Sequence, residues 1–136
     1  MKPTMLGALL WAVITVIPTA QAETAITGRV ELDPAIAAQA EPEDTLYVFA
    51  RAEAGPRMPL AVIKARVKEL PLRFQLDDGM AMTPAMRLSQ FPKVVVIARI
   101  SKSGSTRAEH GDLEGTSPSV APGARGVTVV INHVVP

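Results

Sequence analysis

An all-β, antiparallel sandwich of about seven strands is the fold that this sequence predicts for most of the chain. Three observations predict it. Apolar and polar residues alternate with a period of two in several short segments. Twelve prolines and nine glycines are spread along 136 residues, which suits short strands and turns better than long helices. The mature part of the chain carries no convincing amphipathic helix, and its length fits one domain.

The first 22 residues are expected to form a cleavable signal peptide. Lys2 gives a positive start, and residues 5–17 form an uninterrupted apolar or neutral run. Ala20 and Ala22 place small residues at both cleavage-site positions. The run is shorter than the roughly 20 residues that a membrane span needs. We therefore expect cleavage after Ala22, with residues 23–136 exported as one domain without an integral membrane segment; an uncleaved N-terminal anchor is the alternative.

The alternation places the strands. They are predicted at Thr24–Leu32, Thr45–Ala52, Leu60–Val67, Leu72–Leu76, Lys93–Lys102 and Gly126–Val135. Thr45–Ala52 is apolar on both sides, which predicts a strand covered on both faces, and the start of Lys93–Lys102 indicates a central strand. Leu60–Val67 also fits helical spacing, but Pro59 and Pro71 bracket it and favour a strand.

Three segments lack strand periodicity. Ala35–Asp44 is expected to be a loop with a possible short helical turn, and Asp77–Gln90 a long structured loop. Ser103–Gly123 is polar and rich in turn residues, so we predict irregular structure there.

Charge and composition exclude several classes of function. The 14 Lys+Arg nearly balance 13 Asp+Glu, which argues against nucleic acid or an anionic membrane as the main partner. The absence of cysteine removes thiolate metal sites and thiol chemistry. His110 is expected to be solvated and His133 half-buried in a strand, and neither has a placed catalytic partner. Asp77 and Asp78 precede Gly79, a pattern that more often forms a turn than a carboxylate pair. We therefore predict a protein that is not an enzyme and needs no cofactor.

Methionine forms the unusual local cluster. Met80, Met82 and Met86 fall within seven residues, and Met58 lies near the Gly55-Pro56 turn. Such residues fill irregular core gaps or make adaptable surfaces for protein partners. Thioethers also suit Cu(I), so a copper site of Met80, Met82 and Met86 is the alternative, disfavoured because no histidine is nearby.

A locally basic stretch accompanies these methionines. It comprises Arg51, Arg57, Lys64, Arg66, Lys68 and Arg73. Its outward members could gather on one sheet face, although a solvated strand face is the simpler interpretation.

Several ordered motifs resemble a known family. They are residues 47–62 (YVFARAEAGPRMPLAV), 76–82 (LDDGMAM), 91–104 (FPKVVVIARISKSG), 111–115 (GDLEG) and the closing valine-rich strand. Together they resemble the C-terminal periplasmic, Ig-like domain of CcmI/CycH-type cytochrome c biogenesis proteins, from about Ala25 to Val135. The resemblance implies an Ig-like sandwich in the periplasm. It also implies a chaperone-like accessory factor whose partners are apocytochrome c or components of haem ligation.

The chain departs from that family pattern in two respects. Family members usually carry N-terminal membrane helices and a helical-repeat domain, which we do not find here, and Gly79 stands where Ser is expected. The partner-binding candidates are Arg57, Met58, Pro59, Asp77, Asp78, Met80, Met82, Met86 and Phe91. Arg51, Gly55, Pro56 and Pro92 are further motif positions. A purely structural module is a third, weaker possibility.

Overall fold

A computed structural model describes residues 23–136 of the chain. The predicted signal peptide, residues 1–22 with cleavage after Ala22, lies outside the described residues. Within residues 23–136, no helix is long and apolar enough to cross a lipid bilayer.

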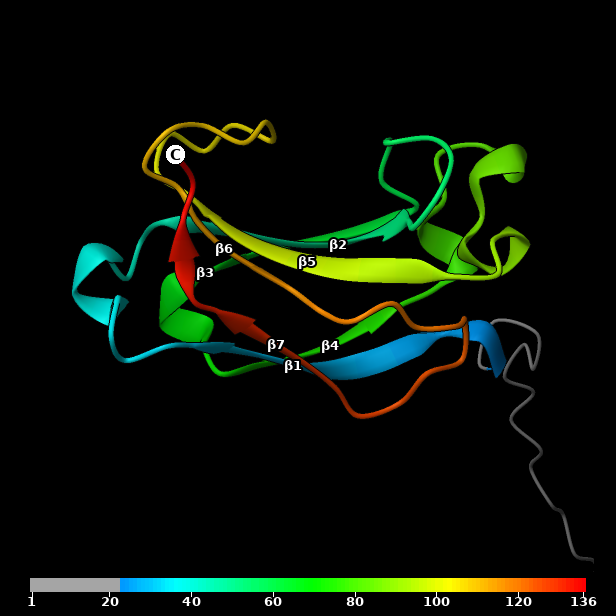
Figure 1. The fold of residues 1–136 in the computed structure, drawn as a ribbon, viewed down its shortest axis with the longest axis horizontal. Coiled ribbons are helices and arrows are strands. Elements are labelled where there is room, and N and C mark those ends of the chain that lie inside the picture. The colour runs from blue at the N-terminus through cyan, green and yellow to red at the C-terminus, as the bar shows by residue number, and fades with distance from the viewer. Residues whose placement is uncertain (1–22) are drawn as a thin grey trace, which may run out of the picture.

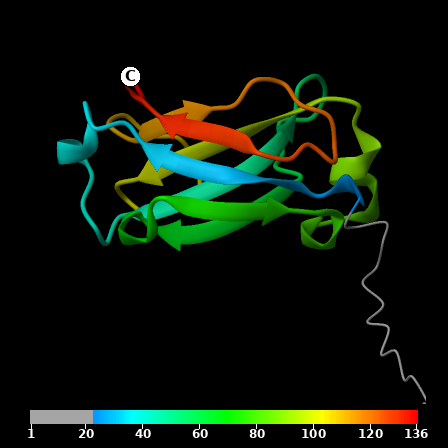
Figure 2. The same cartoon turned by 90° about the horizontal axis from the view of Figure 1, so that it is seen from below.

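Two sheets pack face to face (Figure 1), which confirms the predicted all-β sandwich. The eight described strands are β1 (Ile26–Leu32), β2 (Thr45–Ala52), β3 (Ala61–Arg66), β4 (Leu72–Leu76), β5 (Val94–Ser101), β6 (Leu113–Thr116), β7 (Val127–Ile131) and β8 (His133–Val134). The smaller sheet has the order β4-β1-β7 and the larger sheet the order β3-β2-β5-β6-β8. Figure 2 shows β1 lying between β4 and β7. Within residues 23–136, every strand pairing is antiparallel except that of β1 with β7.

The core lies between the two sheets. Its fully covered side chains include Ile26, Val30, Leu46, Val48, Leu76, Val96, Ile100, Val129 and Ile131. They alternate with outward residues along each strand because successive side chains of a strand point to opposite faces. Burying one such side chain stabilises the fold by about 1.5–3 kcal/mol. Since the chain has no cysteine, this core stabilises the fold without the disulfides that many small extracellular domains use.

The segment Leu60–Val67 forms a strand, as predicted, and its helical spacing is not used. β3 pairs with β2 in continuous antiparallel register, from Ala61 opposite Ala50 to Arg66 opposite Thr45. The 3-10 turn η2 (Val67–Glu69) follows directly, and its hydrogen bonds end the strand. Cross-strand pairing therefore outweighs the local helical pattern.

The remaining short helical turns lie in the predicted loops. They are η1 (Ala37–Gln39), η3 (Asp78–Met80), η4 (Pro84–Met86) and η5 (Leu88–Gln90). Residues 77–90 are thus a structured loop, as expected, and Leu88 anchors this loop in the core with its side chain fully covered.

The prediction of irregular structure throughout Ser103–Gly123 is wrong for β6. This strand pairs with β5, yet Leu113 is its one large apolar side chain and Gly115 weakens the strand signal. Gly115 lies where the end of β7 crosses β6. A Cβ at this position would lie 1.9 Å from the carbonyl oxygen of Val130, so the crossing requires glycine.

The prediction of one closing strand over Gly126–Val135 is also wrong, because the segment divides at Asn132. β7 runs parallel to β1 in the smaller sheet, whereas β8 pairs antiparallel with β6 in the larger sheet. β1 ends at Leu32, so β7 has no further partner beside it, and the Asn132 amide donates instead to the Glu114 carbonyl at 3.2 Å. His133 is therefore an exposed residue of the edge strand β8, whereas the sequence predicted a half-buried strand residue.

We expect Gly115→Ala to lower the free energy of unfolding by about 1–3 kcal/mol, because the added methyl group meets backbone rather than a movable side chain. Thr116→Ala is the control, since its side chain is exposed in the same strand and its change should stay within about 0.5 kcal/mol. Denaturant unfolding measures both, and equal midpoints would contradict the proposed crossing constraint.

Asp44 makes the stability depend on pH. Burial raises the pKa of this carboxyl, but the hydrogen bonds from Lys102 Nζ (2.6 Å) and the Glu41 amide (2.9 Å), with the Lys102 charge, outweigh it and lower the pKa overall. A carboxyl with a lowered folded-state pKa stabilises the fold above its unfolded value near 4, and this contribution disappears as the pH falls through the folded-state pKa.

We therefore expect Asp44→Asn to cost about 1 kcal/mol at pH 7 and almost nothing at the acid end of a pH series. Glu43→Gln serves as the matched control, because Lys68 also lowers the pKa of Glu43 but the Glu43 side chain is 67 % exposed, so its effect should be smaller. Thermal unfolding across pH checks the pair, and a difference for Asp44→Asn that persists at low pH would contradict the assignment.

Candidate functional site

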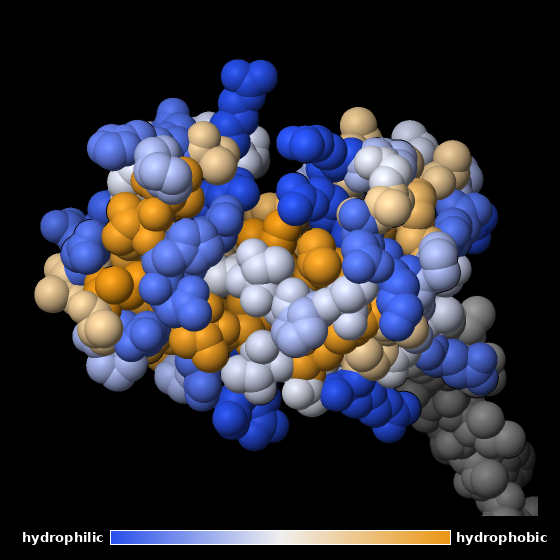
Figure 3. Space-filling view, in the orientation of Figure 1, coloured by the Kyte–Doolittle hydropathy of each residue, from blue (hydrophilic) through white to orange (hydrophobic). Residues whose placement is uncertain are grey.

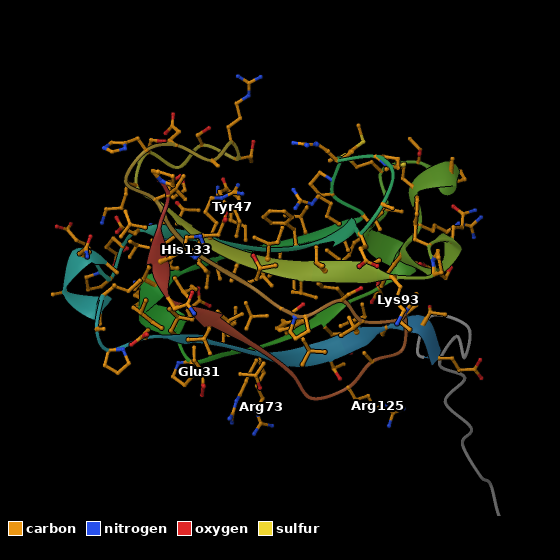
Figure 4. All side chains as sticks on the ribbon, viewed as in Figure 1. Glu31, Tyr47, Arg73, Lys93, Arg125 and His133 are labelled. Carbon is orange, nitrogen blue, oxygen red and sulfur yellow. The ribbon has the colours of Figure 1, made fainter. Side chains whose placement is uncertain are left out.

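The outer face of the larger sheet carries a second apolar cluster. Tyr47, Phe49 and Ile97 form it, with Val95 packed against them. Their exposed fractions are only 7, 8 and 3 %, although they point away from the core. Figure 4 shows Tyr47 above the larger sheet, on the side away from the smaller one. Because the two sheets of residues 23–136 leave this face outside the sandwich, neighbouring loops must exclude water from these side chains.

The loop of residues 102–112 covers one end of this face. It is the gold coil at the upper left of Figure 1. The Tyr47 hydroxyl donates a hydrogen bond to the Gly104 carbonyl at 2.7 Å, and the Ser101 hydroxyl donates to the Ser105 carbonyl at 2.8 Å. Two strands of the sheet thus hold this loop over the aromatic cluster.

A buried carboxylate also holds the loop of residues 102–112, through hydrogen bonds to its backbone. Asp112 is 1 % exposed and accepts hydrogen bonds from the backbone amides of Lys102 (3.0 Å) and Glu109 (2.9 Å). These bonds join the two ends of the loop. The loop of residues 102–112, which forms one wall of the groove described below, therefore has a fixed shape.

The connection between β2 and β3 covers the other end. Gly55 adopts φ 120°, a conformation that side-chain-bearing residues rarely adopt, so the chain turns there and brings Met58 and Pro59 back over the sheet. Met82, from the structured loop, lies beside them at the same hollow. Met58 is 51 % exposed and Met82 is 74 % exposed. Two flexible thioether side chains thus border the apolar face from different segments.

Arg99 joins the two halves of the face. Its guanidinium carbon lies 5.2 Å from the centroid of the Phe49 ring, a cation–π contact. Its Nε donates to Glu114 Oε2 at 2.8 Å, its Nη2 forms an ion pair with the same oxygen at 2.8 Å, and its Nη1 donates to the Thr106 carbonyl at 3.2 Å. Glu114 therefore neutralises Arg99, and Arg99 ties the loop to the sheet.

Between these walls lies a groove of about 520 Å³, which we name the outer groove. It is lined by Tyr47, Phe49, Arg51, Arg57, Met58, Pro59, Val62, Met82, Arg99 and Thr106. Figure 3 shows a notch in the upper outline of the molecule with hydrophilic side chains on both sides of it. A hollow of similar size near Asp33 and Val67 contains none of the predicted binding residues. The outer groove is therefore the candidate site.

Four of the predicted binding residues line the outer groove. Arg57, Met58 and Pro59 come from the β2–β3 turn, and Met82 comes from the loop after β4. The fold thus brings together two motifs that are far apart in the sequence, at one apolar surface.

The two predicted aspartates form turns. Asp77 accepts a hydrogen bond from the Gly79 amide at 2.9 Å, and Asp78 accepts from the amide (2.9 Å) and hydroxyl (2.6 Å) of Ser89. This arrangement agrees with the turn interpretation. These hydrogen bonds also shape the loop that carries Met82, so Asp77 and Asp78 contribute to the groove only indirectly.

The other three predicted residues lie away from the groove lining. Met80 is 36 % exposed on η3, while Met86 and Phe91 pack against the main core. Met80, Met82 and Met86 therefore have different surroundings. The copper site remains a prediction that this arrangement does not favour.

Sequence reasoning missed Tyr47, Phe49, Val62, Arg99 and Thr106 as groove residues. A signal for the first two was present, because Thr45–Ala52 was predicted to be covered on both faces while its outward side chains were aromatic. No sequence signal placed Arg99 over Phe49, since that contact depends on strand pairing between distant segments.

The histidines show no catalytic arrangement. His110 is exposed in the 102–112 loop, as predicted. His133 Nε2 lies 3.7 Å from Glu114 Oε1, at the edge of the sheet. Across residues 23–136, no three or more His, Cys, Asp or Glu side chains gather as a metal ion would require.

Comparison with known proteins identifies the family. Residues 26–132 match the family described as the cytochrome c-type biogenesis protein H Ig-like domain. This chain belongs to that family. The match covers all strands through β7, including both walls of the outer groove, so the resemblance read from the motifs is confirmed.

A curated relative gives the same result. The cytochrome c-type biogenesis protein CycH of Pseudomonas aeruginosa is 42 % identical over 86 residues, which is 63 % of this chain and 21 % of that protein. The match thus spans about a fifth of the relative's length. No solved structure matches the chain.

We expect Asp112→Ala to loosen the wall formed by residues 102–112. Its two backbone amide partners lose a charged acceptor, which should destabilise the domain by about 1.5–3 kcal/mol. Hydrogen exchange at the Lys102 and Glu109 amides should accelerate beyond what the change in global stability explains. Asp33→Ala is the control, since it removes one exposed local bond to the Ala35 amide. Unchanged exchange at Lys102 would contradict the role of Asp112.

Proposed function

We propose that this domain is a non-enzymatic protein-binding module in cytochrome c biogenesis, and that the outer groove holds its partner. One observation carries the proposal: two family motifs, at Arg57–Pro59 and at Met82, meet over an aromatic cluster on the outer face of the larger sheet. Apolar pockets with adaptable methionine borders suit polypeptide side chains of varied shape.

The proposed partner is apocytochrome c or a component of haem ligation, encountered in the periplasm after export by the leader of residues 1–22. The family name and the CycH relative support a role in cytochrome c biogenesis. An apocytochrome lacks the haem that completes its core, so it exposes apolar side chains that gain free energy by burial in such a groove.

The proposed activity is binding without a catalytic step. Two carboxylates near the groove have structural roles: Glu114 holds Arg99, and Asp112 holds the 102–112 loop. What remains accessible at the groove is apolar or cationic surface, which can hold a segment of chain and limit its aggregation.

Site-specific photo-crosslinking in the periplasm tests this function. A photoreactive residue at position 82 should capture apocytochrome c or a haem-ligation component, because Met82 is 74 % exposed at the groove. The same residue at position 130 is the control, since Val130 is an exposed apolar residue of the smaller sheet. Identical partners at both positions, or no cytochrome-maturation protein at position 82, would count against the proposal.

Substitution provides the matching loss of function. Met82→Asp should reduce capture of that partner at least tenfold, because it introduces a charge into the apolar border and leaves the core untouched. Val130→Asp should retain capture. Both variants should unfold at temperatures close to that of the wild type, so lost folding would be recognised separately from lost binding.

A further inference from the structure

We propose that the outer groove selects a polypeptide segment in which apolar side chains lie next to acidic ones. The apolar side chains would lie on Tyr47, Phe49 and Val62, and the carboxylates would pair with Arg51 and Arg57. This inference rests on the proposed function and adds to it the chemistry of the bound segment.

The first observation is that two guanidinium groups at the groove lack partners. Arg99 is neutralised by Glu114, but within residues 23–136 the side chains of Arg51 and Arg57 make no hydrogen bond, ion pair or ring contact. Arg57 is exposed and Arg51 is half-buried. The fold therefore leaves two guanidinium cations at the groove without an acidic partner in the domain of residues 23–136.

Other members of the predicted basic stretch behave differently. Arg66 and Lys68 both pair with Glu43, at 3.4 and 2.9 Å, and Arg73 belongs to the smaller sheet. Of the six residues, Arg66 and Lys68 are paired and Arg51 and Arg57 line the groove, while Lys64 and Arg73 belong to neither group. Closeness in the sequence therefore does not decide which of these cations lie at the groove; the fold does.

The second observation is a polar cleft that continues the groove. It has a volume of about 280 Å³ and is lined by Arg51, Ala52, Glu53, Gly55, Pro56 and Arg57. Arg51 and Arg57 line both hollows, so the apolar groove and the polar cleft meet at these two residues. Glu53 also lines the cleft but forms no ion pair with either arginine, and the cleft keeps a net positive charge.

The chemistry of this junction favours carboxylates. A guanidinium presents two parallel N–H donors that match the two oxygens of a carboxylate, and such bonds are about twice as strong as neutral ones. An apolar segment without acidic residues would leave both arginines partly desolvated and unpaired, which costs binding free energy.

The dimensions favour a short extended segment. Tyr47, Phe49 and Arg51 point to the same side of β2 at two-residue spacing, so they span about 14 Å. About four residues of extended chain cover that distance. Along β2 two aromatic residues are followed by an arginine, so the apolar side chains of the bound segment would lie beside its acidic ones.

Fluorescence polarisation with labelled peptides tests the inference on the exported chain. The probe is Gly-Leu-Ala-Phe-Glu-Glu-Gly with an amidated C-terminus. A second peptide replaces both Glu with Lys, and a third replaces Leu and Phe with Ser. The first should bind at least tenfold more tightly than either of the others, and added salt should weaken it.

Matched double variants locate the site. Arg51→Gln with Arg57→Gln should weaken the acidic peptide at least tenfold and leave the lysine peptide no weaker. Arg29→Gln with Arg73→Gln removes the same charge from the outer face of the smaller sheet, from which Arg73 projects in Figure 4, and should leave binding unchanged.

Four outcomes would overturn the inference. These are equal affinity for the acidic and lysine peptides, no binding of the acidic peptide at millimolar concentration, equal loss in both double variants, and equal or tighter binding of the serine peptide. Self-association that requires Arg51 and Arg57, measured by sedimentation, would assign the groove to a second copy instead. If Met82→Asp abolishes partner capture while peptide charge has no effect, the proposed function stands and the acidic preference falls.

Discussion

The structure depends on β2 being covered on both faces. Its inward residues Leu46, Val48 and Ala50 are fully buried against the smaller sheet, and its outward residues Tyr47 and Phe49 are buried almost as well. A strand of this kind creates two separate packing requirements. The second sheet meets one of them. The other is met by loops, and because loops cover a sheet face incompletely, a groove remains between them.

The loops that meet this second requirement are held by polar contacts. The Tyr47 hydroxyl, the Arg99 guanidinium and the Asp112 carboxylate each bind backbone groups of residues 102–112. These contacts satisfy polar groups that would otherwise be buried without partners. The groove wall consequently has a defined shape before any partner arrives, which lowers the entropic cost of binding.

Strand positions were accessible from the sequence wherever one physical signal dominated. Thr45–Ala52 was predicted with its observed bounds because apolar residues on both faces specify a central strand. β6 was missed because it contains Gly115, which lowers the local strand signal. Glycine is needed there because a Cβ would collide with the Val130 carbonyl of β7. The division at Asn132 was missed because it depends on where β1 ends, a tertiary fact absent from the local pattern.

The candidate site was likewise only partly predictable from the sequence. The methionine and GPRMP motifs were visible in the sequence, but their meeting over Phe49 required the pairing of β2, β3 and β5. Pairing also separates arginines that look equivalent in the sequence.

Arg99 and Arg51 both point outward from neighbouring strands, yet Glu114 lies opposite Arg99 in β6, whereas Arg51 lies opposite the apolar Val95. One arginine is thereby built into the wall and the other stays available to a ligand. The charge selectivity of the groove is therefore set by strand register, because a two-residue shift of β6 along β5 would remove the Arg99 partner and leave a third free cation at the same surface.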